Sequence, residues 1–146
     1  MDFIIRPATK EDIPAIYNLI LEGKINFTGL DWNRFVLAVA PGGEVIGCGQ
    51  IKPHRDGSQE LASIVVTRAW REKGVARGII EHLVDGFDGP LHLMCQSSMG
   101  PMYEKFGFRA LGEDEMPRYF RRVSKLAGIV EPLRKQGEKL LVMVRE

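Results

Sequence analysis

The sequence has little cysteine, because only Cys48 and Cys95 occur among its 146 residues. Both lie in apolar runs, and neither belongs to a CxxC pair or to the cysteine and histidine spacing of a zinc site. The sequence therefore predicts neither a disulfide framework nor a bound metal. Such thiols are typical of a reducing compartment.

Long apolar runs are also missing. No stretch reaches the roughly 18 apolar residues that a membrane-spanning helix needs. Residues 1–10 do not show a basic region followed by an apolar segment, which is the pattern of a secretory signal. We therefore expect no membrane partner and a cytoplasmic protein.

There is no excess of charge of one sign. The chain has 20 basic and 19 acidic residues, and its formal net charge is +1. A protein that binds nucleic acid through its overall field is usually strongly basic, so we expect no nucleic-acid partner. A chain of this length buries roughly two thirds of its unfolded surface, which is enough for one core. We expect a single domain over residues 1–146.

Glycine and proline divide the chain into short segments of alternating type. The apolar spacing predicts strands at 3–6, 35–40, 45–51, 60–67, 91–95, 108–111 and 139–145. It predicts helices at 9–23, with Thr9 as cap, and at 74–85, 98–106 and 117–126. Residues 24–33 could be a loop or a short helix. This order is typical of an α/β fold in which a central mixed sheet has helices on both faces.

The most informative stretch is Arg71-Glu-Lys-Gly-Val-Ala-Arg-Gly78, where a strand leads into a helix. Small residues at a helix start let a phosphate approach the backbone, and the unpaired amides and the helix dipole favour negative charge there. The stretch is neither a P-loop nor GxGxxG. It could bind a pyrophosphate, or it could be an ordinary turn made of small residues.

Within this stretch, Arg71-x-x-Gly74-x-Ala76 resembles the [Gln/Arg]-x-x-Gly-x-[Gly/Ala] signature of the GNAT acetyltransferases. Tyr103-Glu-Lys-Phe-Gly-Phe108 is similar to a second hallmark of that family. The resemblance covers most of residues 3–111, although Gln96 stands where many members have Asn. It implies the GNAT fold, a mixed but mostly antiparallel sheet, and acetyl-CoA as the co-substrate, with no metal.

The resemblance also implies roles for individual residues. Ile64, Val65 and Val66 would bind the pantetheine arm through their backbone, with the Val66 amide near the thioester carbonyl. Tyr103 would lie beside the sulfur of coenzyme A and protonate the leaving thiolate. The residues that would surround the pyrophosphate are Arg71, Lys73, Gly74, Val75, Ala76, Arg77 and Gly78.

An alkyl ammonium with a pKa near ~10 must lose a proton before it can attack a thioester, so the reaction needs a base. Glu60 lies where one branch of the family has its catalytic Glu. Strand alternation also places Glu60 on the face of Ile64 and Val66. Glu60 could instead be the polar first residue of a strand, and a bound water could be the base.

Other side chains have ordinary interpretations. Cys95 is expected to be a buried thiol and Trp32 a core aromatic or part of the acceptor site. His54, in a polar loop, and His82, on the outer face of its helix, are expected to lie at the surface.

The identity of the acceptor is left open by the pattern. The segments expected to form its site are 24–34, 52–59 and 112–138. The basic segment around Arg118, Tyr119, Arg121, Arg122 and Lys125 resembles the tail of amino-acid N-acetyltransferases related to N-acetylglutamate synthase, in which an Arg fork could bind a carboxylate. It could equally be a solvated face or a surface that docks nucleic acid.

Taken together, these features predict an N-acetyltransferase that acts by direct attack in a ternary complex, on the primary amine of a small molecule or amino acid. The chain could be a monomer or a homodimer. The alternatives are acetylation of protein lysines or N-termini, and a non-catalytic acyl-CoA-binding module.

Overall fold

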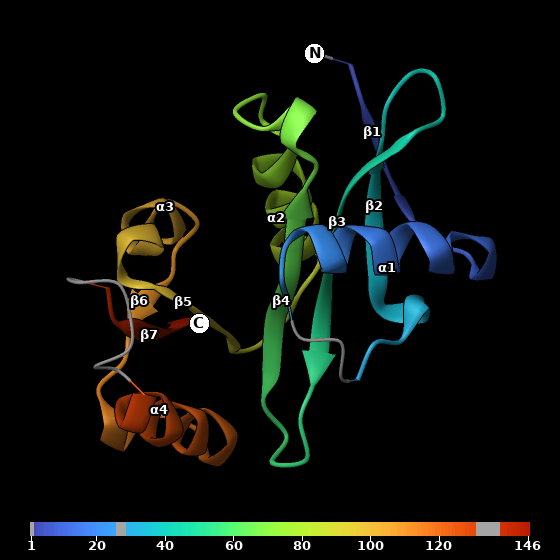
Figure 1. Cartoon of the computed structure of the whole chain (residues 1–146). Coiled ribbons are helices and arrows are strands. Elements are labelled where there is room, and N and C mark those ends of the chain that lie inside the picture. Colours follow the sequence, from blue (N-terminus) through green and yellow to red (C-terminus); the bar gives the residue numbers. More distant parts are fainter. Residues whose placement is uncertain (1, 26–28, 131–137) are drawn as a thin grey trace. The chain divides into compact units, whose positions relative to one another are not determined.

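The computed structural model describes residues 2–25, 29–130 and 138–146 (Figure 1). Two compact units make up the chain: Met1–Lys52 with Leu61–Phe87, and Pro53–Glu60 with Asp88–Glu146. Parts of the expected acceptor segments, at 26–28 and 131–137, lie outside the described residues.

The first unit contains helices α1 (Ile13–Glu22) and α2 (Val75–Asp85). Its strands are β1 (Ile4–Pro7), β2 (Phe35–Val39), β3 (Val45–Pro53) and β4 (Gln59–Val66). The last residue of β3, Pro53, and the first two residues of β4 belong to the second unit. β1 pairs with β2, and β2 with β3, in antiparallel register.

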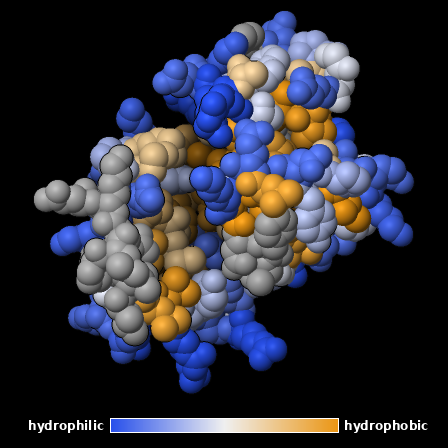
Figure 2. All heavy atoms as spheres, viewed as in Figure 1, coloured by the Kyte–Doolittle hydropathy of each residue, from blue (hydrophilic) through white to orange (hydrophobic). Residues whose placement is uncertain are grey.

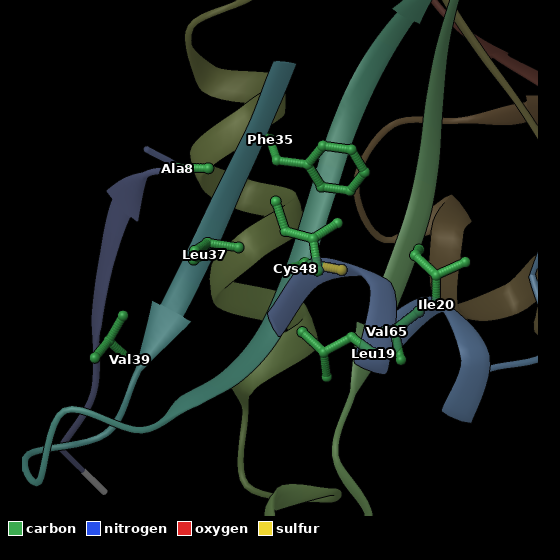
Figure 3. Close-up of a cluster of buried hydrophobic side chains, with 9 residues drawn as sticks. Ala8, Leu19, Ile20, Phe35, Leu37, Val39, Cys48 and Val65 are labelled. Atoms are coloured by element: carbon green, nitrogen blue, oxygen red, sulfur yellow. The ribbon is translucent and has the colours of Figure 1, made fainter. Parts of the chain in front are cut away.

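The helices of this unit cover opposite faces of its strands, because neighbouring strand residues point to opposite sides. Leu37 of β2 packs in a cluster with Leu19 and Ile20 of α1 (Figure 3). Its neighbour Ala38 packs in another cluster with Ile79 of α2. Near-continuous apolar strands such as β2 are what a sheet covered on both faces requires.

The start of α1 is fixed by Asp12. Its carboxylate accepts the Thr9 N–H at 2.7 Å, so Thr9 caps a 3₁₀ turn, Lys10–Asp12, that precedes the helix. Arg6 donates two hydrogen bonds to the same carboxylate, at 2.8 and 3.0 Å, and this guanidinium holds the pKa of Asp12 well below its usual range.

The second unit contains α3 (Gly100–Glu104), α4 (Arg118–Val130) and strands β5 (Leu91–Gln96), β6 (Arg109–Ala110) and β7 (Leu140–Arg145). β7 pairs antiparallel with both β5 and β6. Phe120 of α4 is buried in a core with Met116 and Val142. The first residues of β4 pair in parallel with β5, where Glu60 is opposite His92.

The strands are hydrogen-bonded in the order β1-β2-β3-β4-β5-β7-β6. This mixed, mostly antiparallel arrangement confirms the expected fold class. All expected strands and helices are found, with two differences: the helix expected at 98–106 is a 3₁₀ turn, Ser97–Met99, followed by the short α3, and α4 continues past Leu126. Among the described residues no helix has the length and apolarity to cross a membrane.

The visible surface is mainly polar, and hydrophobic side chains are exposed between the polar ones (Figure 2). The exposed large apolar residues include Ile4 on the edge strand β1, Leu21 on α1 and Leu126 on α4. They come from separate elements, and single exposed apolar side chains are normal for a folded protein.

Glycines in β3 allow α2 to lie close to the sheet. A Cβ added at Gly49 would come within 2.7 Å of both Ile64 Cδ1 and Ile79 Cγ2, and one at Gly47 within 3.0 Å of Ile79 Cδ1. At these positions a larger residue would push α2 away from the strands.

We predict that Gly49→Ala lowers the free energy of unfolding by roughly 1–3 kcal/mol, because the new methyl group overpacks a dense core. Urea denaturation measures this change. Gly42→Ala is the matched control, since a Cβ there meets nothing within 4 Å. Equal stability of the two variants would show that α2 does not need the space at Gly49.

Candidate functional site

The turn between β4 and α2 is fixed by Arg71. Its Nε donates to the Val66 carbonyl at 3.1 Å, and its guanidinium lies 3.7 Å from Glu22 of α1. The same Glu22 carboxylate accepts the Arg68 N–H at 3.1 Å. The Arg71 side chain therefore has a structural role within the turn, in addition to the charge it brings.

The first turn of α2 presents unpaired amides. Gly74 caps the helix with a left-handed φ of 83° and gives no side-chain hydrogen bond. A Cβ at Gly74 would meet no atom within 4 Å, so the space in front of these amides is open. Helix N-termini of this kind bind anions through free N–H groups and the helix dipole. Val75 and Ile79, both buried, anchor the helix behind the turn.

Cationic side chains surround this helix start. Lys73 lies 5.7 Å from the centre of the Trp70 ring. Arg77 is exposed and pairs with Glu81 at 2.8 Å. Gly78, in contrast, faces the core, because a Cβ there would lie 3.1 Å from the Phe3 ring. Of the residues expected at the pyrophosphate, Gly78 and the buried Val75 thus serve the packing of α2, and the exposed ones are Arg71, Lys73, Gly74 and Arg77.

The backbone of β4 has an unusual conformation at Ser63. Ser63 has a φ of 59°, which a non-glycine residue rarely adopts. Its backbone carbonyl accepts from Cys48 Sγ at 3.3 Å, and its hydroxyl accepts from Gln50 at 2.8 Å. Glu60 contacts His54, whereas Ile64 packs against the cluster under α2, so the two side chains have different surroundings.

Downstream of Ser63, β4 presents its side chains to the helices. Val65 belongs to the cluster under α1, whereas Ile64 and Val66 pack against the cluster under α2. Their side chains are thus engaged in packing, and those of Ile64 and Val66 are partly buried.

Tyr103, in the second unit, is half-buried on α3, and its ring packs edge-on against Phe108 with 6.1 Å between centres. Burial, with Cys95 as a neighbour, raises the pKa of Tyr103 to about 12. Its hydroxyl therefore keeps its proton at neutral pH and can act as a donor. Cys95 is half-buried, and burial together with Glu138 raises the pKa of its thiol, so it is a poor nucleophile.

Glu60 is buried, with 7% of its surface exposed, and is paired. Its Oε1 lies 2.7 Å from Nε2 of His54. The interpretation of His54 as a surface residue was wrong: its side chain is only 7% exposed and its ring stacks on Tyr119, with 3.6 Å between ring centres. His82, by contrast, is exposed on α2 as expected.

Asp56 connects the same loop to the start of α4. Its carboxylate accepts the Tyr119 N–H at 2.9 Å and two hydrogen bonds from Ser58, at 2.9 and 2.5 Å. Desolvation raises the pKa of Asp56, but these hydrogen bonds outweigh it and lower the pKa to about 2. The ionised carboxylate stabilises the helix N-terminus, where negative charge is favoured.

A cavity of about 450 Å³ opens where this loop meets α4. It is lined by His54, Arg55, Asp56, Arg118, Tyr119 and Arg122. The other two cations of the tail are engaged elsewhere: Arg121 donates to the Met116 carbonyl at 3.1 Å, and Lys125 pairs with Glu113 at 3.6 Å. Of the described cations of α4, Arg118 and Arg122, one helical turn apart, are those that line the cavity.

No comparable grouping suggests a metal. Within the described ranges, no three His, Cys, Asp or Glu side chains lie together so that they could hold an ion.

Comparison with known proteins identifies the family of more than half of the chain. The model of the acetyltransferase (GNAT) domain matches residues 31–110, which is more than half of the 146 residues. This range contains the turn before α2, Glu60 and Tyr103. A search of the curated proteins finds no match.

Solved structures of similar fold are numerous. N-acetylglutamate synthase from Neisseria gonorrhoeae, complexed with coenzyme A and N-acetyl-glutamate, is 21% identical with a TM-score of 0.72; the match covers 99% of this chain but only 35% of the synthase. Rv2747 from Mycobacterium tuberculosis, in complex with CoA, is 20% identical with a TM-score of 0.71, and the match covers 97% and 98% of the two chains.

A third solved structure is named for a protein acceptor rather than for an amino acid. It is described as histone acetyltransferase HPA2 and related acetyltransferase, from Corynebacterium glutamicum, with 15% identity and a TM-score of 0.68 over 99% of this chain and 96% of the other. Identities this low show a shared fold only, and the fold accommodates different acceptors.

We predict that Gly74→Val weakens coenzyme A binding by roughly 10-fold or more, because the side chain fills the space before the amides, whose attraction for an anion is worth about 1–2 kcal/mol. Calorimetry measures the affinity. Gly43→Val is the control: it places the same residue at a similar left-handed φ, 92°, in an equally open turn. If both variants bound coenzyme A like the parent, the helix start would not be the pyrophosphate site.

Proposed function

The chain belongs to the GNAT acetyltransferase family, and on that premise we propose that it transfers an acetyl group from acetyl-CoA to the amine of a small molecule that carries a carboxylate. The amine attacks the thioester directly in a ternary complex. The observation that supports an acceptor with a carboxylate is the cavity lined by Arg118 and Arg122.

The cofactor half of the proposal rests on the first unit. The amides of the α2 N-terminus, with Arg71, Lys73 and Arg77 nearby, have the charge and the open space that a pyrophosphate requires. The backbone of Ile64 to Val66 would bind the pantetheine arm, as an added strand does. The Val66 N–H would stabilise the oxyanion that forms on the thioester carbonyl.

The acid and the base of the proposal come from the second unit. Tyr103, protonated at neutral pH, would give its proton to the leaving thiolate. Glu60 is the buried carboxylate that would drive removal of the ammonium proton. Because it is hydrogen-bonded to His54, its basicity is available to a substrate either directly or through that ring.

Three features support a small carboxylate-bearing acceptor. Two arginines one turn apart can present a fork of donors to a carboxylate. The cavity volume of about 450 Å³ is typical of a small-molecule site. In addition, the synthase of similar fold was solved with N-acetyl-glutamate, an acetylated amino acid.

A panel of acceptors tests this function. The parent protein is mixed with acetyl-CoA and with amino acids, the amines that lack their carboxylate, and lysine-containing peptides, and each product is scored by its mass shift. We expect acetylation of amino acids above all. Preferred acetylation of peptides would favour a protein acceptor. If no amine were acetylated, the chain would instead be a non-catalytic acyl-CoA-binding module.

We predict that Tyr103→Phe lowers kcat by on the order of 10- to 1000-fold while the affinity for coenzyme A is little changed, because only the proton donor is lost. Steady-state kinetics and calorimetry separate the two quantities. Tyr17→Phe, on α1, removes a hydroxyl in the other unit and controls for the general effect. A parental kcat for Tyr103→Phe would make Tyr103 a packing residue.

We predict that Arg122→Ala raises KM for an amino-acid acceptor by roughly 10- to 100-fold, since hydrogen bonds to a charged group are worth about 1.5–3 kcal/mol. KM for the matching amine without a carboxylate should hardly change. Lys125→Ala is the control, because Lys125 lies on the same helix but pairs with Glu113. An equal rise for both acceptors would mean that Arg122 does not bind the carboxylate.

A further inference from the structure

The proton acceptor of the reaction can be sought at the wall of the basic cavity. Among the described residues, the six that line the cavity include His54 but not Glu60. We propose that His54 takes the proton from the acceptor's ammonium and that Glu60 is a positioning residue that acts through it. This inference rests on the proposed acetyl transfer and assigns its base.

The ring of His54 is held in one orientation. Nε2 lies 2.7 Å from Glu60 Oε1, and these two side chains are 7% and 9% exposed. One face of the ring stacks on Tyr119, at an angle of 15° between the planes, and the edge of Phe120 lies 5.6 Å away between centres. A ring packed in this way cannot turn without breaking both the stack and the hydrogen bond.

The hydrogen bond also selects the tautomer. A carboxylate that accepts from Nε2–H leaves the lone pair on Nδ1, and it stabilises the imidazolium that forms when Nδ1 takes a proton. Within the part of the chain that the structure describes, Nδ1 of His54 has no hydrogen-bond partner. The geometry is therefore that of a carboxylate and histidine dyad whose free nitrogen is available to a ligand.

The charges around the ring suit this task. Glu60 and the ionised Asp56 are its acidic neighbours, whereas the cations Arg55, Arg118 and Arg122 disfavour an ammonium beside them. Tyr119 contributes its ring, and His92 lies on the far side of Phe120, 5.1 Å between centres. An acceptor whose carboxylate is bound by the arginines thus has its ammonium in a field that promotes proton loss.

The chemical step balances without any further reactant. The ammonium gives one proton to Nδ1, and its nitrogen then forms a bond to the acetyl carbon. The carbon–sulfur bond breaks, and Tyr103 gives its proton to the sulfur, so that coenzyme A leaves as the thiol. The second proton lost by the nitrogen restores the Tyr103 hydroxyl. His54 finally returns the first proton to water.

A structural role of His54 makes different predictions from a proton-transfer role. His54→Gln keeps an N–H that can donate to Glu60 but cannot accept a proton. We expect kcat to fall by on the order of 100-fold or more at neutral pH, to recover as the pH approaches the pKa of the amine, and KM for acetyl-CoA to stay unchanged. Glu60→Gln should also lower kcat, and the double variant should be no slower than His54→Gln alone.

Chemical rescue supplies the decisive measurement. In His54→Ala, added imidazoles should restore turnover, and the rescued rates should follow the pKa of the imidazole, as a proton-transfer step requires. The control is His82→Ala, which removes an exposed histidine of α2 and should neither lose activity nor respond to imidazole. Thermal unfolding of each variant shows whether it is folded, and His54→Gln carries the test if His54→Ala is not.

The outcomes separate the two proposals. An active parent whose His54→Gln variant has the parental rate and pH profile overturns the role of His54 and leaves the acetyl transfer standing. Rescue that is independent of the imidazole's pKa also overturns the role of His54, because the added imidazole would then only fill the space left by the missing side chain. A parent that acetylates no amine overturns the proposed function and, with it, this inference.

Discussion

The second unit depends on the buried carboxylate of Glu60. Burying an ionised carboxylate costs several kcal/mol unless it is paired and hydrogen-bonded. His54 meets that demand for Glu60, and Tyr119 in turn covers His54. The loop, the start of β4 and the first turn of α4 are therefore linked by one set of contacts. The basic cavity exists because these contacts hold α4 beside the loop, with Asp56 accepting the Tyr119 N–H at 2.9 Å.

In the first unit the corresponding constraint is steric. Gly49 lets α2 lie close to the sheet, so that the helix start is held rigidly by a dense core. Gly74, in contrast, faces open space and has a left-handed φ, so its lack of a side chain serves access and conformation rather than packing. The rigid helix and the open space act together, because an anion site is strongest when its donors need no reorganisation.

Local patterns in the sequence predicted nearly all strands and helices, because apolar spacing and turn residues determine them directly. The turn at Gly74 was predicted for the same reason. The burial of His54 was not, since it depends on Tyr119, more than sixty residues further along the chain, and the loop around His54 has the polar composition of a surface turn. The left-handed backbone of Ser63 also escaped prediction, because a single positive φ at a non-glycine residue leaves no mark on the alternation of apolar residues.

The family match and helix α4 lie in different parts of the chain. The family model ends at residue 110, and α4 begins at Arg118, beyond it. A common acetyl donor needs the same cradle in every member of such a family, whereas acceptors differ, so the residues that select them belong to segments that the family does not share. The dyad bridges the two parts: Glu60 and His54 lie inside the matched range, but Tyr119 fixes the ring from outside it. A residue of α4 could thereby influence the basicity at the site as well as the choice of acceptor.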